Sequence, residues 1–188
     1  SQVLSLTPTP IANNLEAPGD PPSGTTYPLD LFLCNDCGHL QLGVAVAPEL
    51  LFRNYTYVSP PGMREHWRQH AEHCTSRFSL REGDLVVEAG SNNGDLLREY
   101  QSRSMPVLGF EPAAEIAAIS RGRSIPAESE FFTEKDAVRV AVGKSQAKLV
   151  LANNVFAHLA DLQDFMRAVD VFLADDGVFV FEVHDRRT

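Results

Sequence analysis

The 188-residue sequence is short of cysteine, of basic residues and of long apolar runs, and each shortage excludes a class of protein. Three cysteines are too few for the disulfide framework of a small secreted domain, which favours the reducing cytoplasm. With 16 Lys and Arg against 25 Asp and Glu, the chain lacks the basic face that holds nucleic-acid phosphates or an anionic membrane surface. No apolar run approaches the roughly 20 residues of a membrane-spanning helix. We therefore expect a cytoplasmic protein whose partner is a small molecule, not a nucleic acid or a membrane.

The N-terminal third differs in pattern from the rest of the chain. Its first thirty positions hold six prolines and two glycines, so little regular structure is expected there. Short strands are predicted over 31–33 and 39–44, on either side of Cys34 and Cys37. Two short strands that flank a Cys-x-x-Cys pair are the outline of a zinc-knuckle hairpin. We therefore expect residues 1–60 to form part of a zinc-binding module.

The remainder alternates strand and helix patterns. An apolar stripe at spacings of three and four predicts a helix over 61–78, within a linking segment 61–81. Residues 82–188 then follow the order strand, helix, strand, which predicts an α/β domain with a parallel, Rossmann-like sheet and helices on both faces. The expected strands are 85–88, 107–110, 125–127, 149–152 and 178–181, and the expected helices are 95–102, 113–120, 133–142 and 162–173.

The turn after the first of these strands is the strongest local signal. Gly90 and Gly94 permit a tight turn and close approach of the backbone to a ligand. A dinucleotide-binding turn would carry three glycines as GxGxxG, and the acid Glu88 would repel a pyrophosphate, which disfavours an NAD-dependent dehydrogenase. The same acid suits the amino group of a zwitterionic ligand such as S-adenosylmethionine (SAM). A glycine-rich turn that binds nothing stays open as the alternative.

Polar residues also follow two later strands. Glu111 comes 23 positions after Glu88, where an acid can accept both hydroxyls of a ribose, and it can equally act as a helix-capping carboxylate before Pro112. Asn153 and Asn154 follow the 149–152 strand and would face the cleft, or serve only the turn. His158, a few residues further on, is either a proton-transfer group or a structural histidine.

Several segments together resemble one enzyme family. GSNNGDLL, GFEPA, the pair Phe131-Phe132, LANNVFAHLADLQDF and DGVFVFEV resemble the SAM-dependent sugar C-methyltransferases. Members of that family carry an N-terminal zinc-binding module and methylate keto-deoxysugars attached to a nucleoside diphosphate. The segment Tyr55–Ser59 resembles the family too, and the similarity keeps the same order over nearly the whole chain.

The resemblance implies roles for particular residues. The methionine end of SAM would lie against Glu88, Gly90 and Asn92, next to the turn glycine Gly94. Glu111 would bind the ribose, Phe131 and Phe132 would border the adenine, and Asn154 would close the site. On the substrate side the implied residues are Tyr55 and Tyr57, and the catalytic candidates are His158 and Tyr57. Cys34 and Cys37 would be metal ligands.

Two departures from the family pattern qualify these expectations. The family's zinc site uses two Cys-x-x-Cys pairs and only one is present, so structural zinc is expected only in the full-length protein. The family's catalytic base and further strands belong to segments that would follow Thr188, so the chain is expected to be truncated at both ends and inactive by itself. The expected reaction is 3-C-methylation of a nucleotide-linked 4-keto-deoxysugar. The alternatives are a SAM-dependent O- or N-methyltransferase of another small metabolite, or an inactive SAM-binding fragment.

Overall fold

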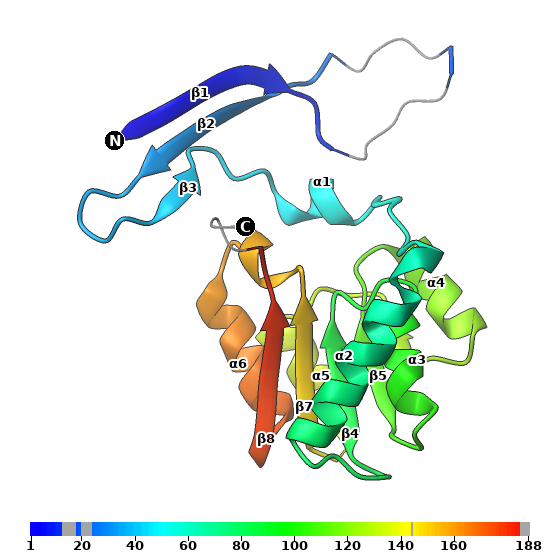
Figure 1. Cartoon of the computed structure of the whole chain (residues 1–188). Coiled ribbons are helices and arrows are strands. Elements are labelled where there is room, and N and C mark those ends of the chain that lie inside the picture. Colours follow the sequence, from blue (N-terminus) through cyan, green and yellow to red (C-terminus); the bar gives the residue numbers. More distant parts are fainter. Residues whose placement is uncertain (13–17, 20–23, 144, 185–188) are drawn as a thin grey trace. The chain divides into compact units, whose positions relative to one another are not determined.

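The computed structural model describes residues 1–12, 18–19, 24–143 and 145–184, and the chain divides into two compact units, Ser1–Tyr57 and Val58–Thr188 (Figure 1). The helix expected to link two modules, α2 (Arg64–Arg77), belongs to the second unit. Each unit is described by itself below. Within the described ranges, no helix has the length and the apolar character needed to cross a membrane.

The first unit is a small antiparallel sheet followed by one short helix. Its strands are β1 (Gln2–Thr9), β2 (Tyr27–Leu33) and β3 (Leu40–Leu42), in the order β1-β2-β3, and its helix is α1 (Pro48–Phe52). The hairpin predicted around the cysteine pair is confirmed, because β2 and β3 pair antiparallel and the connection between them carries Cys34 and Cys37. None of the described residues of this unit is buried, so it has no apolar core of its own.

The expectation of little regular structure in the first thirty residues is wrong for β1. This strand pairs antiparallel with β2, and the side chains of Gln2 and Ser5 donate hydrogen bonds to Asp30 Oδ1 at 3.2 and 2.6 Å. The ladder shifts register between Leu6 and Thr9, opposite Pro28, which has no N–H to donate. Proline therefore interrupts the ladder without preventing the strand. The segments 13–17 and 20–23 of that expectation lie outside the described residues.

The second unit contains a five-stranded, all-parallel sheet in the order β6-β5-β4-β7-β8. Its strands are β4 (Leu85–Ala89), β5 (Val107–Phe110), β6 (Ala127–Glu128), β7 (Ala147–Asn153) and β8 (Leu173–Glu182). Its helices are η1 (Pro61–Met63), α2, α3 (Asp95–Gln101), α4 (Ala114–Gly122), α5 (Glu134–Ala141), η2 (Phe156–His158) and α6 (Leu162–Phe172). The predicted alternation of strand and helix is confirmed, with β6 shorter and β8 longer than expected.

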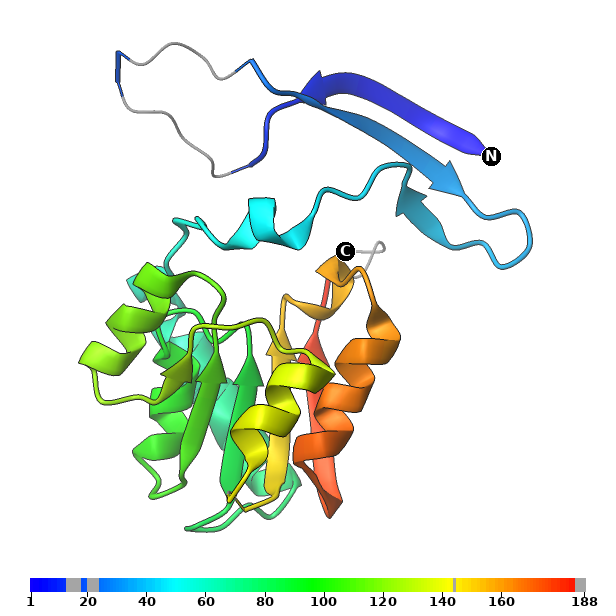
Figure 2. The same ribbon diagram turned by 180° about the vertical axis from the view of Figure 1, so that it is seen from behind.

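Alternate residues along the strands supply two separate cores. Val86, Leu149 and Leu151 belong to the apolar cluster that α2 and α3 cover. Val87 and Val150, which point to the opposite face, pack with α5 and α6. Figure 1 shows α2 in front of the sheet, and Figure 2 shows α5 and α6 on the reverse side. The domain therefore has three layers, as period-two alternation in a sheet buried on both faces requires.

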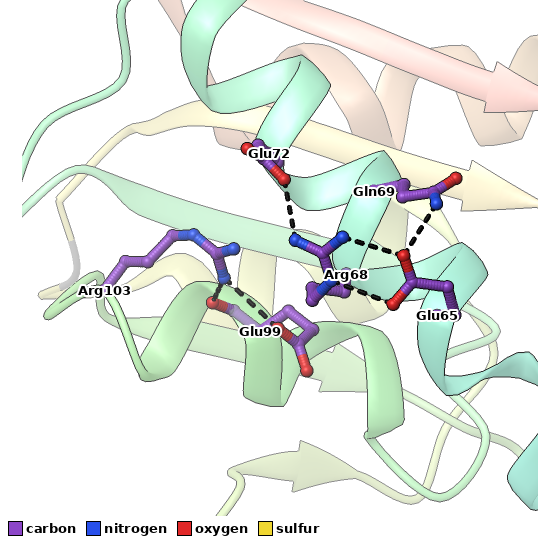
Figure 3. Close-up of polar contacts among 6 residues, drawn as sticks. All are labelled: Glu65, Arg68, Gln69, Glu72, Glu99 and Arg103. Carbon is purple, nitrogen blue, oxygen red and sulfur yellow. Dashed lines mark hydrogen bonds and ion pairs between the residues drawn. The ribbon is translucent and has the colours of Figure 1, made fainter.

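Helix α2 is held on the sheet by its apolar face. Trp67, Ala71 and Cys74 are buried against the α3 side of the core, so Cys74 is a core residue. On its outer surface, Arg68 bonds Glu65 and Glu72 with N···O distances of 2.7 and 2.9 Å (Figure 3). Exposed ion pairs of this kind contribute little to stability, because solvent screens them. Burial of the apolar face that carries Trp67 therefore holds α2 on the sheet, and the opposite, charged face is exposed to water.

The strand order places the site within this fold. The chain passes from β4 to β5 and β6 on one side, and then returns to β7 and β8 on the other side of β4. In open α/β sheets, ligands bind at the carboxyl ends of the strands where the order reverses, which here is the junction of β4 and β7. Polar side chains that follow these two strands are therefore the first candidates for a binding site.

Gly109→Ala is expected to lower the free energy of unfolding by about 2 kcal/mol. An added Cβ at this β5 position would overlap the Ser91 hydroxyl and lie 2.7 Å from Ser91 Cβ and 3.1 Å from Leu97 Cδ1. Urea unfolding followed by circular dichroism measures the change. The control is Gly122→Ala at the end of α4, where an added Cβ meets nothing within 4 Å and should stabilise by about 0.5 kcal/mol. A Gly109→Ala midpoint equal to that of wild type would contradict this close packing.

Candidate functional site

The turn between β4 and α3 is built around two glycines. Gly90 and Gly94 have φ of 68° and 78°, in the left-handed region that favours glycine. A Cβ at Gly90 would overlap the side chain of Val155, and one at Gly94 would lie 2.6 Å from Ser120 Oγ. Both predicted turn glycines are therefore required by backbone conformation and by space. The turn brings its backbone close to the ends of β5 and β7.

Glu88, the last acid of β4, is a buried carboxylate with a free oxygen. Its side chain is 5% exposed, and Oε2 has no hydrogen-bond partner in the part of the chain that the structure describes. Burial, and to a lesser extent the charge of Glu111, raise the pKa of Glu88 to about 8. A buried acceptor without a donor is costly unless something supplies the hydrogen bond. Glu88 is therefore suited to a ligand with a cationic N–H group.

Glu111 lies at the end of β5 and is held by two backbone groups. Its Oε2 accepts from the backbone N–H of Asn92 at 3.0 Å, and its Oε1 accepts from that of Ala113 at 2.9 Å. Burial raises the pKa of Glu111, while these two N–H groups oppose the shift. The bond to Ala113 is the capping role considered from the sequence. Each oxygen keeps a second lone pair, so the carboxylate can also accept hydroxyl groups of a ligand.

The side chains of Asn92 and Asn93 are engaged within the protein. Asn92 Oδ1 accepts from the backbone N–H groups of Ser59 and Asn93, both at 2.9 Å. Asn93 is 2% exposed; its Nδ2 donates to Asp95 Oδ2 at 3.0 Å and its Oδ1 accepts from the Asp95 N–H at 3.3 Å. The Asn92 side chain thus connects the segment before η1 to the turn. Its contribution to the site is to hold the turn in place, because its amide oxygen is already used within the protein.

The two asparagines after β7 differ in what they contact. Asn154 is exposed, has φ of 56°, and donates from Nδ2 to Glu182 Oε1 at 3.1 Å. The other oxygen of Glu182 lies 3.2 Å from His66 Nε2 of α2. Asn153 is 9% exposed, and neither its Oδ1 nor its Nδ2 has a partner within the described ranges. The resemblance singled out Asn154, yet Asn153 is the residue with a free buried amide.

The phenylalanine pair is divided between core and surface. Phe132 is buried, with its ring centroid 5.0 Å from that of Phe110 and 5.2 Å from that of Phe165. Its side chain belongs to the apolar cluster under α5 and α6, together with Phe110 and Phe165. Phe131 is half-buried. Of the pair expected to border an adenine, Phe131 is the one whose side chain the core leaves accessible.

The remaining candidates are spread over both units. His158 is exposed in η2, next to the carboxyl end of β7. Tyr55 and Tyr57 belong to the first unit, where their ring centroids are 6.1 Å apart and Tyr57 is 47% exposed. The second unit by itself brings together the β4–α3 turn, Glu88 and Glu111, with Asn153 on the neighbouring strand.

Cys34 and Cys37 do not by themselves fit a complete zinc site. Hydrogen bonds from the backbone N–H groups of Cys37 and Asp36 lower the pKa of the Cys34 thiol, which favours the thiolate that metals bind. Zinc in structural sites takes four protein ligands. In the described ranges, no group of three or more His, Cys, Asp or Glu side chains is placed to hold a metal ion.

Comparison with known proteins covers both parts of the chain. Residues 63–188 match the family model described as "Methyltransferase domain", and residues 1–52 match one described as "Putative zinc binding domain". The C-methyltransferase NovU of Streptomyces niveus is 34% identical over 184 residues, which are 96% of this chain and 44% of NovU. The chain therefore spans less than half the length of this curated relative.

Two solved structures share the fold. The plantazolicin methyltransferase BpumL, in complex with a pentazolic desmethylPZN analog and S-adenosylhomocysteine (SAH), superposes with a TM-score of 0.51 at 10% identity, covering 65% of this chain and 48% of BpumL. An S-adenosylmethionine-dependent methyltransferase from Clostridium acetobutylicum gives 0.50 at 14% identity, covering 63% and 49%. The predicted Rossmann-like fold of SAM methyltransferases is confirmed. Since the methyltransferase model matches well over half of its residues, this chain belongs to the methyltransferase family.

Proposed function

We propose that this chain is the cofactor-binding part of a SAM-dependent C-methyltransferase that acts on a nucleotide-linked keto-deoxysugar. The observation that carries the proposal is the 34% identity to a C-methyltransferase over 96% of the chain. That similarity includes the N-terminal segment as well as the methyltransferase domain. The geometry of the second unit supports the cofactor, and the family resemblance supports the substrate class.

The residues at the β4–β7 junction fit SAM. The orphaned carboxylate oxygen of Glu88 would accept the ammonium group, and Glu111 would accept the ribose hydroxyls. Gly90 and Gly94 let the turn pack its backbone against Val155 and Ser120, which sets the path of the turn at the cofactor site, and Phe131 would border the adenine. When bound, SAM supplies an electrophilic methyl group on a sulfonium. This chain's own task would be to hold the methyl group at the carboxyl ends of the strands, with water excluded.

The substrate side follows from the chemistry of carbon methylation. A carbon beside a ketone can lose a proton to a base, and the resulting enolate is a carbon nucleophile. We propose Tyr55 and Tyr57 as residues that approach the sugar, and His158 and Tyr57 as candidates for handling protons. By the same resemblance, the methylated position is carbon 3 of a 4-keto sugar, and zinc is a structural metal of the N-terminal module.

Methyl transfer by the full-length protein is expected to require a ketone next to the methylated carbon. The measurement uses SAM with a ¹³C-labelled methyl group, a nucleoside-diphosphate 4-keto-6-deoxysugar, and its 4-hydroxy counterpart as the control. The expected product carries the label in a new carbon–carbon bond, seen by NMR, and only with the keto sugar. Label on oxygen or nitrogen, or transfer to the 4-hydroxy sugar, would favour the O- or N-methyltransferase alternative.

SAM is expected to bind residues 1–188 saturably in a calorimetric titration, and NAD is not, because the β4–α3 turn lacks the third glycine of a dinucleotide-binding turn. Glu111→Ala should weaken SAM binding by about tenfold or more, since it removes a charged acceptor from the ribose. The matched control is Glu115→Ala, which removes an exposed acid from the first turn of α4. Equal affinities of SAM for wild type and Glu111→Ala would exclude the ribose role.

Glu88→Gln is expected to change how stability depends on pH. In the unfolded chain the carboxyl ionises near its ordinary pKa of 4.5, whereas in the fold it stays protonated up to about pH 8. Between these values the folded state binds the extra proton, so rising pH destabilises wild type by roughly 1 kcal/mol per pH unit relative to the Gln variant. Urea unfolding at several pH values from 4.5 to 8 measures this, with the exposed Glu82→Gln as control. Parallel curves for Glu88→Gln and wild type would show that Glu88 ionises normally.

A further inference from the structure

We propose that Asn153 holds the amino-acid end of SAM, whereas the sequence resemblance singled out its neighbour Asn154, as a residue that closes the site. This inference rests on the proposed cofactor. Its first observation is that the Asn153 side chain is 9% exposed while both Oδ1 and Nδ2 lack hydrogen-bond partners among the described residues. Buried side-chain amides in folded proteins normally have partners, so a wholly unpaired one indicates a group that a ligand satisfies.

The strand register places Asn153 beside Glu88. Glu88 of β4 is paired with Leu151 of β7, and paired residues in a parallel sheet point to the same face. Asn153 follows Leu151 by two residues, so its side chain projects from that face as well. Both positions lie at the carboxyl ends of their strands, at the switch point of the sheet. Two of the unpaired buried polar groups of this domain therefore lie on the same face of the sheet, at the carboxyl ends of neighbouring strands.

The two groups complement an α-amino acid. Beside a bound ammonium group Glu88 is ionised and offers only acceptors, whereas an amide offers an acceptor oxygen and two N–H donors. Asn153 Oδ1 can therefore share the ammonium group with Glu88, and Nδ2 can donate to the ligand's carboxylate. That carboxylate would otherwise face the negative charge of Glu88 without a compensating donor. A neutral amide at this place lets one acidic site accept a zwitterion.

Asn154 is already occupied within the protein. Its Nδ2 donates to Glu182 Oε1 at 3.1 Å, and its backbone N–H donates to the Glu182 carbonyl at 2.7 Å. These bonds hold its left-handed backbone at the start of the loop after β7, with φ of 56°. Asn154 therefore shapes the turn that follows β7, and the free amide next to it remains available to the ligand.

The test separates the amino-acid end of the ligand from the nucleoside end. SAH carries both, and 5′-methylthioadenosine carries the nucleoside without the amino acid. In calorimetric titrations, Asn153→Ala is expected to weaken SAH by about tenfold or more, and 5′-methylthioadenosine by less than about twofold. Asn154→Gly, which keeps the left-handed backbone, should weaken SAH much less than Asn153→Ala does. Equal losses for the two ligands in Asn153→Ala, or an unchanged SAH affinity, would overturn the inference.

A second variant guards against a folding defect. Asn153→Leu replaces an unpaired amide by an apolar group of similar volume, so its midpoint of thermal unfolding without ligand should rise, while SAH binding falls as in Asn153→Ala. A lower midpoint would mean that the amide already makes stabilising bonds in the fold, and would overturn the inference. If wild type binds 5′-methylthioadenosine but not SAH, the assignment of Asn153 fails while a nucleoside site remains. If it binds neither, the proposed function itself fails.

Discussion

The docking of one turn on the neighbouring strand controls the site. The backbone N–H groups of Gly90 and Ser91 both donate to the carbonyl of Phe110, at 2.8 and 3.0 Å, and the next N–H, of Asn92, donates to the carboxylate of Glu111. Three consecutive donors of the β4–α3 turn are therefore satisfied by the end of β5. The path of this turn therefore sets the distance between Glu88 of β4 and Glu111 at the end of β5. Glycine at position 109 leaves room for the Ser91 side chain, so the two segments can approach this closely.

Two buried acids near each other are unfavourable in a chain that is already acidic. The formal net charge is -9, and burial raises the pKa of both Glu88 and Glu111. The fold tolerates them because apolar clusters on both faces of the sheet supply most of its stability. Glu111 has backbone donors, whereas Glu88 retains an unpaired oxygen. The protein thus places incompletely hydrogen-bonded buried polar groups where a zwitterionic ligand can supply their partners, as preorganised sites do.

Much of this was accessible from the sequence, for physical reasons. The βα units could be predicted because the repeat of apolar residues in a strand or helix is visible within a short stretch of sequence. Glu88 and Glu111 could be singled out because each lies near the end of a recognisable strand. The strand β1 was missed because its paired residues in β2 lie 18 to 30 positions further along the chain and the prolines in this region suggest a loop. Phe132 was assigned to the ligand because two adjacent aromatics do not reveal which one faces the core. Asn153 could have been preferred from the sequence, since it continues the 149, 151 period of a buried strand. The lack of partners for its amide is visible only in three dimensions.

The pair Asn93-Gly94 has a consequence for how long the molecule lasts. Asparagine followed by glycine is chemically fragile, because the glycine nitrogen can attack the side-chain amide and release ammonia. Here the amide of Asn93 is bonded on both of its polar atoms to Asp95, and the Gly94 nitrogen donates to the Ser91 carbonyl at 3.0 Å. The attacking nitrogen and its target are both restrained while the turn stays closed. Chemical ageing at this bond is therefore governed by how often the turn opens, and a ligand that closes the site would also preserve the covalent chain.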